Sequence, residues 1–381
     1  MSSGRHLRID AKSPYRQLVG VGGVGTGVFF ELEGEHTLGR NESRLGRLRD
    51  VRDYCKLHIV LHYVAKLLGA GRSEASFRVT PIAKVGDDAS GRRLIQEMRE
   101  TGMETSRIQA VPGSPTLFSV CFQYPDGTGG NITTSHSAAS DLSRRDIAAS
   151  GDLLRPAGEQ LVAVAVPEVP LEVRDYFLQQ ATRNGSLRAA SFAAAEVQPA
   201  LQLGMFKLLD LVSLNEDEGE KLVGCAFSPA APLPFVEKCQ DLLRNSFPDL
   251  TVVVSAGKMG AFGITAKRTQ YCPAPEVDIA STAGAGDSLL GGIVAGLAAG
   301  IPFFSPDATA SGQRNNNVID SAIQLGVLLG SHKCESPHTI HPHACLDTLI
   351  EFANGRGLKF SREIEALFVT DKAKRCPQPV L

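Results

Sequence analysis

The chain has 381 residues, of which 43% are hydrophobic and 21% charged, a composition typical of a globular protein. A formal net charge of −2 offers no support for binding nucleic acid or a membrane surface through bulk charge. The N-terminus lacks the apolar core of a signal peptide, no apolar stretch is long enough to cross a membrane, and the cysteines form no C-x-x-C pair. We therefore expect a cytoplasmic protein with reduced thiols.

The first part of the chain predicts alternating strands and helices. The expected elements are a strand over 17–21, a helix over 57–68, a strand over 78–85 and a helix that ends at Glu100. Glycine-rich segments follow the first strand, the first helix and the second strand, as is usual for turns.

Two polar segments predict a small second sheet. Residues 116–124 alternate between apolar and polar, which is typical of an exposed antiparallel strand, and the pattern resumes near 131–134 after a turn at Asp126-Gly127. A second such piece lies near residues 28–38. Together they would form a small sheet beside the main one.

From about residue 160 the chain alternates regularly. Strands are expected over 161–166, 187–192, 208–214 and 250–254, with helices over 171–182 and 235–244. This alternation predicts a parallel sheet covered by helices on both faces. Because ligands bind outside the carboxyl ends of such strands, we expect Asn215–Glu218 and Ser255–Gly260 at one rim of the sheet.

The most informative stretch is Ser281–Asp287, a run of small residues before the apolar, glycine-rich segment 288–300. Small residues let the backbone approach a ligand, and the N–H groups that begin a helix attract an anion. Asp287 places a carboxylate beside those donors. That pairing suits phosphoryl transfer, although small residues before a helix also occur for packing alone.

The stretch resembles the D-T-x-G-A-G-D signature of the ribokinase-like (PfkB-type) carbohydrate kinases. Thr282 and Gly284–Asp287 match the signature, whereas Ser281 replaces its first acid. The resemblance extends over roughly residues 18–340. Its further marks are the turn Lys84–Asp88 with Gly91, Asp141–Ser143, the N-x-x-E motif Asn215–Glu218, and Ser255–Gly260, which is similar to a T-x-G-x-x-G nucleotide loop.

The resemblance implies a ribokinase-like three-layer α/β/α sandwich with a mostly parallel central sheet and a small β lid. Residues 1–381 would form a single kinase domain, with lid segments at about 28–50 and 114–136. The implied activity is transfer of the terminal phosphoryl group of ATP to a hydroxymethyl group of a sugar-like small molecule, with Mg²⁺ as cofactor. A homodimer through the lid is an expectation of the same kind.

The resemblance also implies a role for each matching residue. Asp287 would be the base that deprotonates the acceptor, and the amides of Ala285, Gly286 and Asp287, with Gly284 at the turn, would form an anion hole. Asn215 and Glu218 would position Mg²⁺. The remaining matches would line the ATP site: Ser255, Gly257, Gly260 and Thr282.

The acceptor half departs from the family pattern. The segment after the first strand, 25–30, is apolar, and its first acid is Glu31, where the family has an earlier acidic residue. Residues 53–60 contain neither the family's Gly-Gly nor its Asn. The acceptor therefore stays unidentified, and Ser281 argues against a monovalent-cation site of the kind some members have.

Two other functions stay open: a nucleoside kinase, and a regulator that binds a sugar or nucleotide without catalysis. The polar segment Arg40–Arg44 would either bind an acidic or phosphorylated sugar or form a solvated loop. Residues 305–317 read as an insertion loop.

Several motifs are set aside. Gly20–Gly25 fits G-x-G-x-x-G, but a strand pattern follows it where a dinucleotide site needs a helix. The histidines and cysteines of 332–345 match no zinc spacing and read as a surface connection. His58 and His62 lack the Glu of an H-E-x-x-H site.

Overall fold

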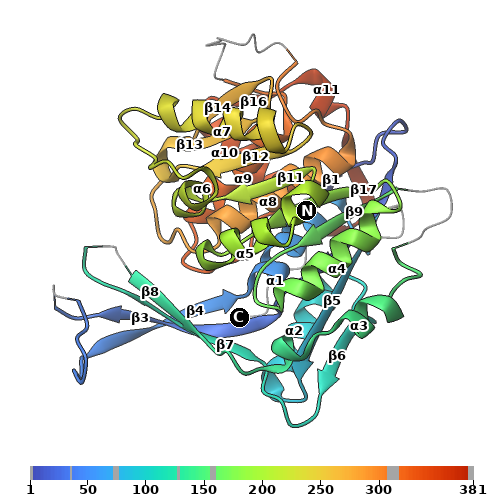
Figure 1. The fold of residues 1–381 in the computed structure, drawn as a ribbon. Helices are drawn as coiled ribbons and strands as arrows, with labels where there is room; N and C mark the ends of the chain where they lie inside the picture. The colour runs from blue at the N-terminus through green and yellow to red at the C-terminus, as the bar shows by residue number, and fades with distance from the viewer. Residues whose placement is uncertain are drawn as a thin grey trace.

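A computed structural model describes residues 3–34, 37–71, 77–126, 129–154, 160–306 and 317–375 of the chain. Its centre is a sheet with the strand order β14-β13-β12-β11-β10-β9-β2-β5-β6 (Figure 1). Neighbouring strands from β12 to β6 in this order run parallel, and β13 and β14 extend the sheet antiparallel at one edge. The prediction of an α/β fold with a mostly parallel sheet is confirmed.

The parallel strands are β2 (Tyr15–Val21), β5 (Arg78–Gly86), β6 (Ile108–Val111), β9 (Gln160–Ala165), β10 (Leu187–Ser191), β11 (Leu211–Leu214) and β12 (Thr251–Ser255). The antiparallel pair is β13 (Gly260–Ile264) and β14 (Thr269–Pro273). Two short pairs lie outside this sheet: β1 (Ser3–Leu7) with β17 (Phe368–Arg375), antiparallel, and β15 (Val318–Ile319) with β16 (Lys359–Phe360).

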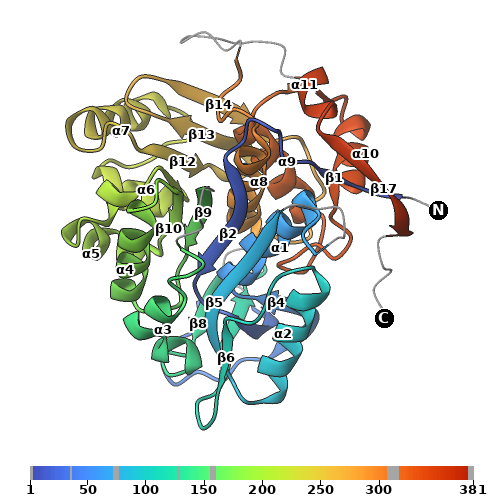
Figure 2. The ribbon, with the colours of Figure 1, turned by 90° about the vertical axis from the view of Figure 1, so that its right-hand side faces the viewer.

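Helices cover both faces of the sheet (Figure 2). One face carries α1 (Lys56–Leu68), α2 (Ala89–Glu100), α8 (Ala285–Ala299), α9 (Ala322–Cys334) and α10 (Leu346–Gly355). The other carries α3 (Arg144–Ala149), α4 (Leu171–Thr182), α5 (Val197–Gln202), α6 (Glu216–Val223) and α7 (Leu233–Ser246). A short α11 (Arg362–Glu365) precedes β17, and single 3₁₀ turns lie at Ala138–Asp141, Ala194–Glu196, Met205–Leu208 and Gly257–Met259.

Alternating side chains create a core on each side of the sheet. Along β9, Val162 and Val164 pack into the α1/α8/α9 core, whereas Leu161 and Ala163 pack into the α4/α7 core. Successive side chains of a strand point to opposite faces, so a strand buried on both sides reads as an unbroken apolar run. This is why the parallel strands β9, β10, β11 and β12 were predictable.

A second, four-stranded sheet projects from the main body (Figure 1). Its order is β4-β3-β7-β8, formed by Gly46–Tyr54, Gly25–Leu32, Leu117–Gln123 and Gly129–Thr133. The predicted small sheet is therefore present, although β7 pairs antiparallel only with β8 and runs parallel to β3. These strands fall largely in the segments 28–50 and 114–136.

Some expected elements differ from the structure. The strand predicted over 208–214 begins only at Leu211, because Met205–Leu208 form a 3₁₀ turn. Most of the predicted loop 305–317 lies outside the described residues, which end at 306 and resume at 317. As expected, no helix follows Gly20–Gly25, since β3 begins at Gly25. No helix in the described part of the chain has the length and apolarity that a membrane span requires.

Candidate active site

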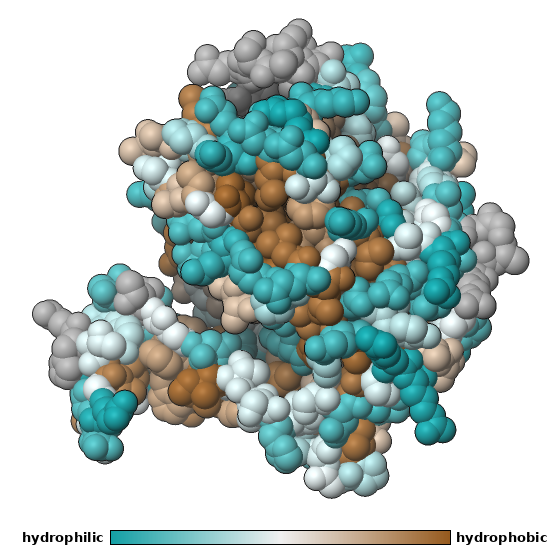
Figure 3. All heavy atoms as spheres, viewed as in Figure 1, coloured by the Kyte–Doolittle hydropathy of each residue, from teal (hydrophilic) through white to brown (hydrophobic). Residues whose placement is uncertain are grey.

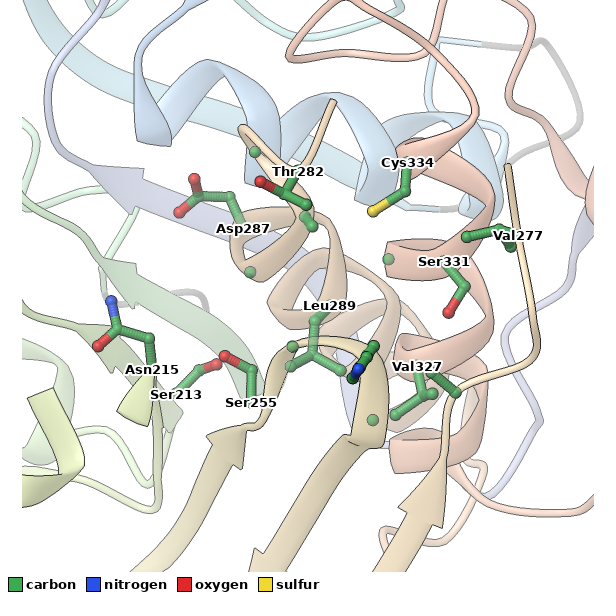
Figure 4. Close-up of a pocket in the computed structure, with 18 of the residues that line it drawn as sticks. Ser213, Asn215, Ser255, Val277, Thr282, Asp287, Leu289, Val327, Ser331 and Cys334 are labelled. Atoms are coloured by element: carbon green, nitrogen blue, oxygen red, sulfur yellow. The ribbon is translucent and has the colours of Figure 1, made fainter. Parts of the chain in front are cut away.

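A cavity of about 950 Å³ opens at the rim where the parallel strands end, beside the N-terminus of α8 (Figure 4). Every residue proposed for the site lines it, from the three segments Asn215–Glu218, Ser255–Gly260 and Thr282–Asp287. Figure 4 shows the side chains of Asp287 and Asn215 on one side of the cavity and those of Val277, Ser331 and Cys334 on the other. The fold thus brings three segments distant in sequence to one cavity.

Gly284 sets the turn that begins α8. Its φ of 81° lies in the left-handed region, and a Cβ there would lie 2.4 Å from the carbonyl oxygen of Thr339. Only glycine tolerates both constraints. The Thr339 hydroxyl in turn accepts the Tyr54 N–H at 2.8 Å, which ties the helix start to the projecting sheet.

The first amides of α8 are of two kinds. The N–H of Ala285 donates to the carbonyl oxygen of Thr282 at 3.1 Å. Those of Gly286 and Asp287 have no backbone acceptor among the described residues. A Cβ at Gly286 would meet no atom within 4 Å, so open space lies in front of it. The helix therefore offers two free donors toward the cavity, reinforced by its dipole.

Asp287 lies in the first turn of α8, with its side chain 12% exposed and an oxygen 3.8 Å from the Lys56 ammonium. Burial raises the pKa of Asp287, and the charge of Lys56 opposes that rise. The same pair raises the pKa of Lys56, because the Asp287 carboxylate stabilises the ammonium more than burial disfavours it. Asp287 is thus an ionisable group with enhanced basicity beside unsatisfied donors.

Glu168 is a second acid in this region that sequence reasoning missed. It follows β9 with a φ of 79°, and its carboxylate accepts the Lys56 backbone N–H at 3.1 Å. Burial raises the pKa of Glu168 to about 7, against the opposing charge of Lys56. Its place just after a parallel strand was the available signal, since ligands bind at that rim.

Asn215 and Glu218 cap helix α6. The Asn215 side chain accepts the Glu218 N–H, and the Glu218 carboxylate accepts the Asn215 N–H, both at 2.8 Å. This capping box commits the Asn215 carbonyl and one Glu218 oxygen, and leaves the other carboxylate oxygen available. Among the described residues no group of three His, Cys, Asp or Glu side chains is arranged to hold a metal. The donor set fits a cation that keeps most of its water shell, as Mg²⁺ does.

The loop after β12 forms another wall of the cavity. Ser255 ends the strand, and Gly260 has a φ of 111°, with the Cys272 carbonyl only 2.0 Å from where a Cβ would lie. Gly260 is therefore fixed as glycine by the neighbouring strand. Farther along, the cavity is lined by apolar side chains: Val277, Ile279, Leu289 and Val327. The cavity thus has a polar, donor-rich end and an apolar end.

The comparisons with known proteins agree with this geometry. A sequence model described as pfkB family carbohydrate kinase matches residues 60–344. The chain belongs to this family. One PfkB protein similar to this chain is a 2-dehydro-3-deoxygluconokinase of Bacillus subtilis. It is 26% identical to this chain over 307 residues, which cover 75% of this chain and 86% of the relative. A ribokinase of Staphylococcus aureus is 24% identical and covers 60% of this chain and 73% of the relative.

Solved structures show the PfkB fold. A Cryptococcus neoformans ribokinase in complex with ADP superposes with a TM-score of 0.67 at 17% identity, over 88% of this chain and 99% of the other. A Burkholderia thailandensis nucleoside kinase in complex with inosine gives 0.63 at 13% identity, over 90% and 99%. The predicted ribokinase-like fold is confirmed.

The departures from the PfkB pattern lie on the projecting sheet and at the start of α1. Asp53, only 6% exposed, accepts a hydrogen bond from the Ser119 hydroxyl at 2.7 Å, and burial raises the pKa of Asp53. Glu31, the first acid after the first strand, is held in an ion pair with Arg49 on the projecting sheet. Lys56 begins α1 where the family's Gly-Gly was expected. Its side chain, rather than glycine backbone, faces the cavity.

The segment Arg40–Arg44 does not line the cavity. Arg44 instead forms an ion pair with Glu42 at 2.8 Å. Arg44 also lies over the ring of Tyr124, whereas Arg40, Asn41 and Ser43 are exposed, which favours a solvated loop over an acceptor-binding segment.

The surface connection predicted over 332–345 is wrong for its first residues. His332, Lys333 and Cys334 form the last turn of α9, and all are buried. Helix α9 is apolar on nearly every side, so it shows no amphipathic period to read from sequence. His58 is likewise a core residue, 1% exposed, whose ring packs on Tyr54 with centroids 4.6 Å apart.

Proposed function

We propose that this protein transfers the terminal phosphoryl group of ATP to a hydroxymethyl group of a sugar-like molecule. The observation that carries the proposal is the placement of the Asp287 carboxylate beside the free amides of Gly286 and Asp287, at the polar end of a large cavity. A base next to an anion hole is what phosphoryl transfer to an alcohol requires.

In the proposed reaction, the Asp287 carboxylate removes the proton from the acceptor hydroxyl as its oxygen attacks the terminal phosphorus. The bond from that phosphorus to the bridging oxygen of ADP breaks. Burial raises the basicity of Asp287, while Lys56 keeps it ionised and ready to accept the proton. The amides of Gly286 and Asp287 stabilise the charge on the phosphoryl oxygens, with Gly284 providing the turn that aims them.

The cavity's two ends suit the two parts of a nucleotide. We place the phosphates at the start of α8, near Thr282, and the flat base against Val277, Leu289 and Val327. The loop of Ser255, Gly257 and Gly260 lies between them and would bind the nucleotide through its backbone.

Mg²⁺, when bound, would neutralise phosphate charge, and Asn215 and Glu218 would hold it through its water shell. Burial raises the pKa of Glu218, and the capping hydrogen bond from Asn215 opposes that rise. The carboxylate is therefore fixed in orientation before any cation arrives.

The four-stranded sheet would act as a lid over the acceptor. Pairing places Asp53, Ser119 and Cys121 on one face of this sheet, close to Lys56 and Glu168. A polar face turned toward an acceptor, and closure that excludes water, would favour transfer over hydrolysis of ATP.

The opposite face of the same sheet is apolar, and we propose that a second copy of the chain covers it. The strand register puts seven apolar side chains on this face: Val28, Phe30, Leu48, Phe118, Val120, Phe122 and Ile132. Leu48 is 59% exposed and Ile132 66% exposed. Figure 3 shows hydrophobic surface on the projecting sheet. Exposed apolar patches of this kind mark interaction sites.

Light scattering after gel filtration tests the dimer. The wild-type protein should elute with the mass of two chains, and Ile132→Asp should elute as one chain with an unchanged thermal melt. A wild-type protein of single-chain mass at micromolar concentration would refute the dimer while leaving the kinase proposal intact.

The kinase proposal is tested by incubating the protein with ATP, Mg²⁺ and a panel of sugars, sugar acids and nucleosides. ADP release and mass spectrometry of the acceptor are the readouts, with Asp287→Asn as the control against contaminating kinases. A product carrying one added phosphoryl group supports the proposal. Phosphorylated nucleosides would favour the nucleoside kinase, and ligand-induced melting shifts with no ADP release would favour a non-catalytic binder.

A further inference from the structure

Lys333 is a charged residue that the proposed reaction does not use. It lies in the last turn of α9, where the negative end of the helix dipole stabilises a positive charge. Its side chain is nevertheless fully buried, at 0% exposure. Burying an ammonium is costly unless something in the fold compensates it.

The compensation comes from the loop that carries the signature. The Lys333 Nζ donates to the carbonyl oxygen of Ser281 at 2.9 Å. Next to it, the N–H groups of Ala280 and Ser281 donate to the carbonyl of Cys334 at 2.8 and 3.2 Å. The end of α9 is thus joined to the loop directly preceding Thr282 and Gly284 by three hydrogen bonds, one of them charged.

In the described part of the chain no carboxylate forms an ion pair with Lys333. Burial lowers the pKa of Lys333 to about 8, which leaves the ammonium charged at neutral pH. A neutral donor would satisfy the Ser281 carbonyl at lower cost. The retained charge therefore points to a function besides packing.

Ser281 also stands where the signature otherwise has an acid. With a serine there, position 281 offers no carboxylate to a cation, and Lys333 brings a covalently attached cation to the backbone of the loop instead. Backbone carbonyl oxygens are the ligands that monovalent cations take in proteins.

We propose that Lys333 is a positioning residue, a built-in replacement for a monovalent cation, that holds the loop Ser281–Gly284 and thereby the anion-hole amides of α8. This inference rests on the proposed function for its role in turnover. It predicts an enzyme whose activity does not depend on K⁺, because the positive charge is supplied by the chain itself.

The test compares wild type, Lys333→Ala and Lys333→Met in buffers whose only monovalent cation is K⁺, Na⁺, methylammonium or the bulky choline. Wild type should turn over equally in all four. Lys333→Ala should lose about tenfold or more in choline, the loss expected for one charged hydrogen bond, and should regain activity in K⁺ or methylammonium. Lys333→Met fills the space without charge and should stay impaired in every buffer.

Affinity for ADP, measured by calorimetry in the same buffers, separates this inference from the proposed function. The same pattern of loss and cation rescue should appear in the ADP dissociation constant even if no acceptor is phosphorylated. Thermal melts check folding, and Lys359→Met, at an exposed lysine, is the matched control. Wild-type activation by K⁺, or a Lys333→Met variant with unchanged ADP affinity and turnover, would overturn the inference.

Discussion

The proposed phosphate side and the proposed acceptor side of the cavity differ in how closely they keep the PfkB pattern. On the phosphate side, Gly284–Asp287 and Asn215–Glu218 keep the spacing of the PfkB family, and their contacts are backbone turns and caps. On the proposed acceptor side, Lys56 stands where the family's Gly-Gly was expected, and it forms a partly buried charge network with Asp287 and Glu168. In the proposed reaction the phosphates are bound mainly by backbone groups, whose geometry tolerates little change, whereas the acceptor would be bound by side chains that are free to differ.

The largest expected effect concerns Asp287, in the segment that keeps the PfkB pattern. Asp287→Asn preserves shape and removes the proposed base, so kcat should fall by at least about 10²-fold, within the range for a positioned general base. ADP affinity should change little. Steady-state kinetics and calorimetry measure both, and Asp217→Asn, an exposed acid in the first turn of α6, serves as the matched control. Turnover near wild type would remove Asp287 from its role.

Two alanine variants distinguish the role of the Gly284 turn from that of the Gly286 backbone donor. Gly284→Ala should destabilise the fold, because its left-handed backbone alone costs about 1–2 kcal/mol and its Cβ would strike Thr339. Gly286→Ala meets open space, so its melting temperature should stay near wild type while its methyl group weakens nucleotide binding. Thermal melts and ADP titration distinguish them; equal melting temperatures for the two variants would contradict the turn argument.

Lys56→Met probes the altered side. Without the ammonium, burial of Asp287 is unopposed, so the pKa of Asp287 should rise and the acid limb of the pH–rate profile should move to higher pH. Turnover at neutral pH should drop roughly tenfold, the size of one charged hydrogen bond. Lys66→Met on the same helix is the control. An unshifted acid limb would show that Lys56 does not tune the base.

The smallest effect concerns stability at Glu168. Its pKa of about 7 is raised above the unfolded value, so the folded state favours the protonated acid, and wild-type stability falls as pH rises from about 4.5 through 7. Glu168→Gln lacks this titration. The melting temperature of the variant, relative to that of wild type, should increase by a few degrees at most as pH rises from 5 to 8. A constant difference across that range would argue against the raised pKa.

The place of Gly284–Asp287 and Asn215–Glu218 at one cavity could be predicted because their sequence signals are local. Gly284–Asp287 and the capping box at Asn215 are contiguous motifs, and β9 and β12 contain unbroken apolar runs. Lys56, Glu168 and Lys333 belong to no such motif, because their contacts are with residues distant in the chain. Lys56 contacts Asp287, Glu168 contacts Lys56, and Lys333 contacts Ser281. The antiparallel strands β13 and β14 were missed for a similar reason, because strand pairing depends on tertiary contacts that the local sequence does not show.

The antiparallel pairing of β1 with β17 brings Ser3 opposite Arg375, so the two ends of the described chain lie side by side (Figure 2). A short linker between them would close an ordinary hairpin. The chain is therefore a good substrate for circular permutation, with new ends opened at an exposed turn that does not line the cavity, such as Gly113. A permuted enzyme could carry a reporter at that turn while both original strands stay in place.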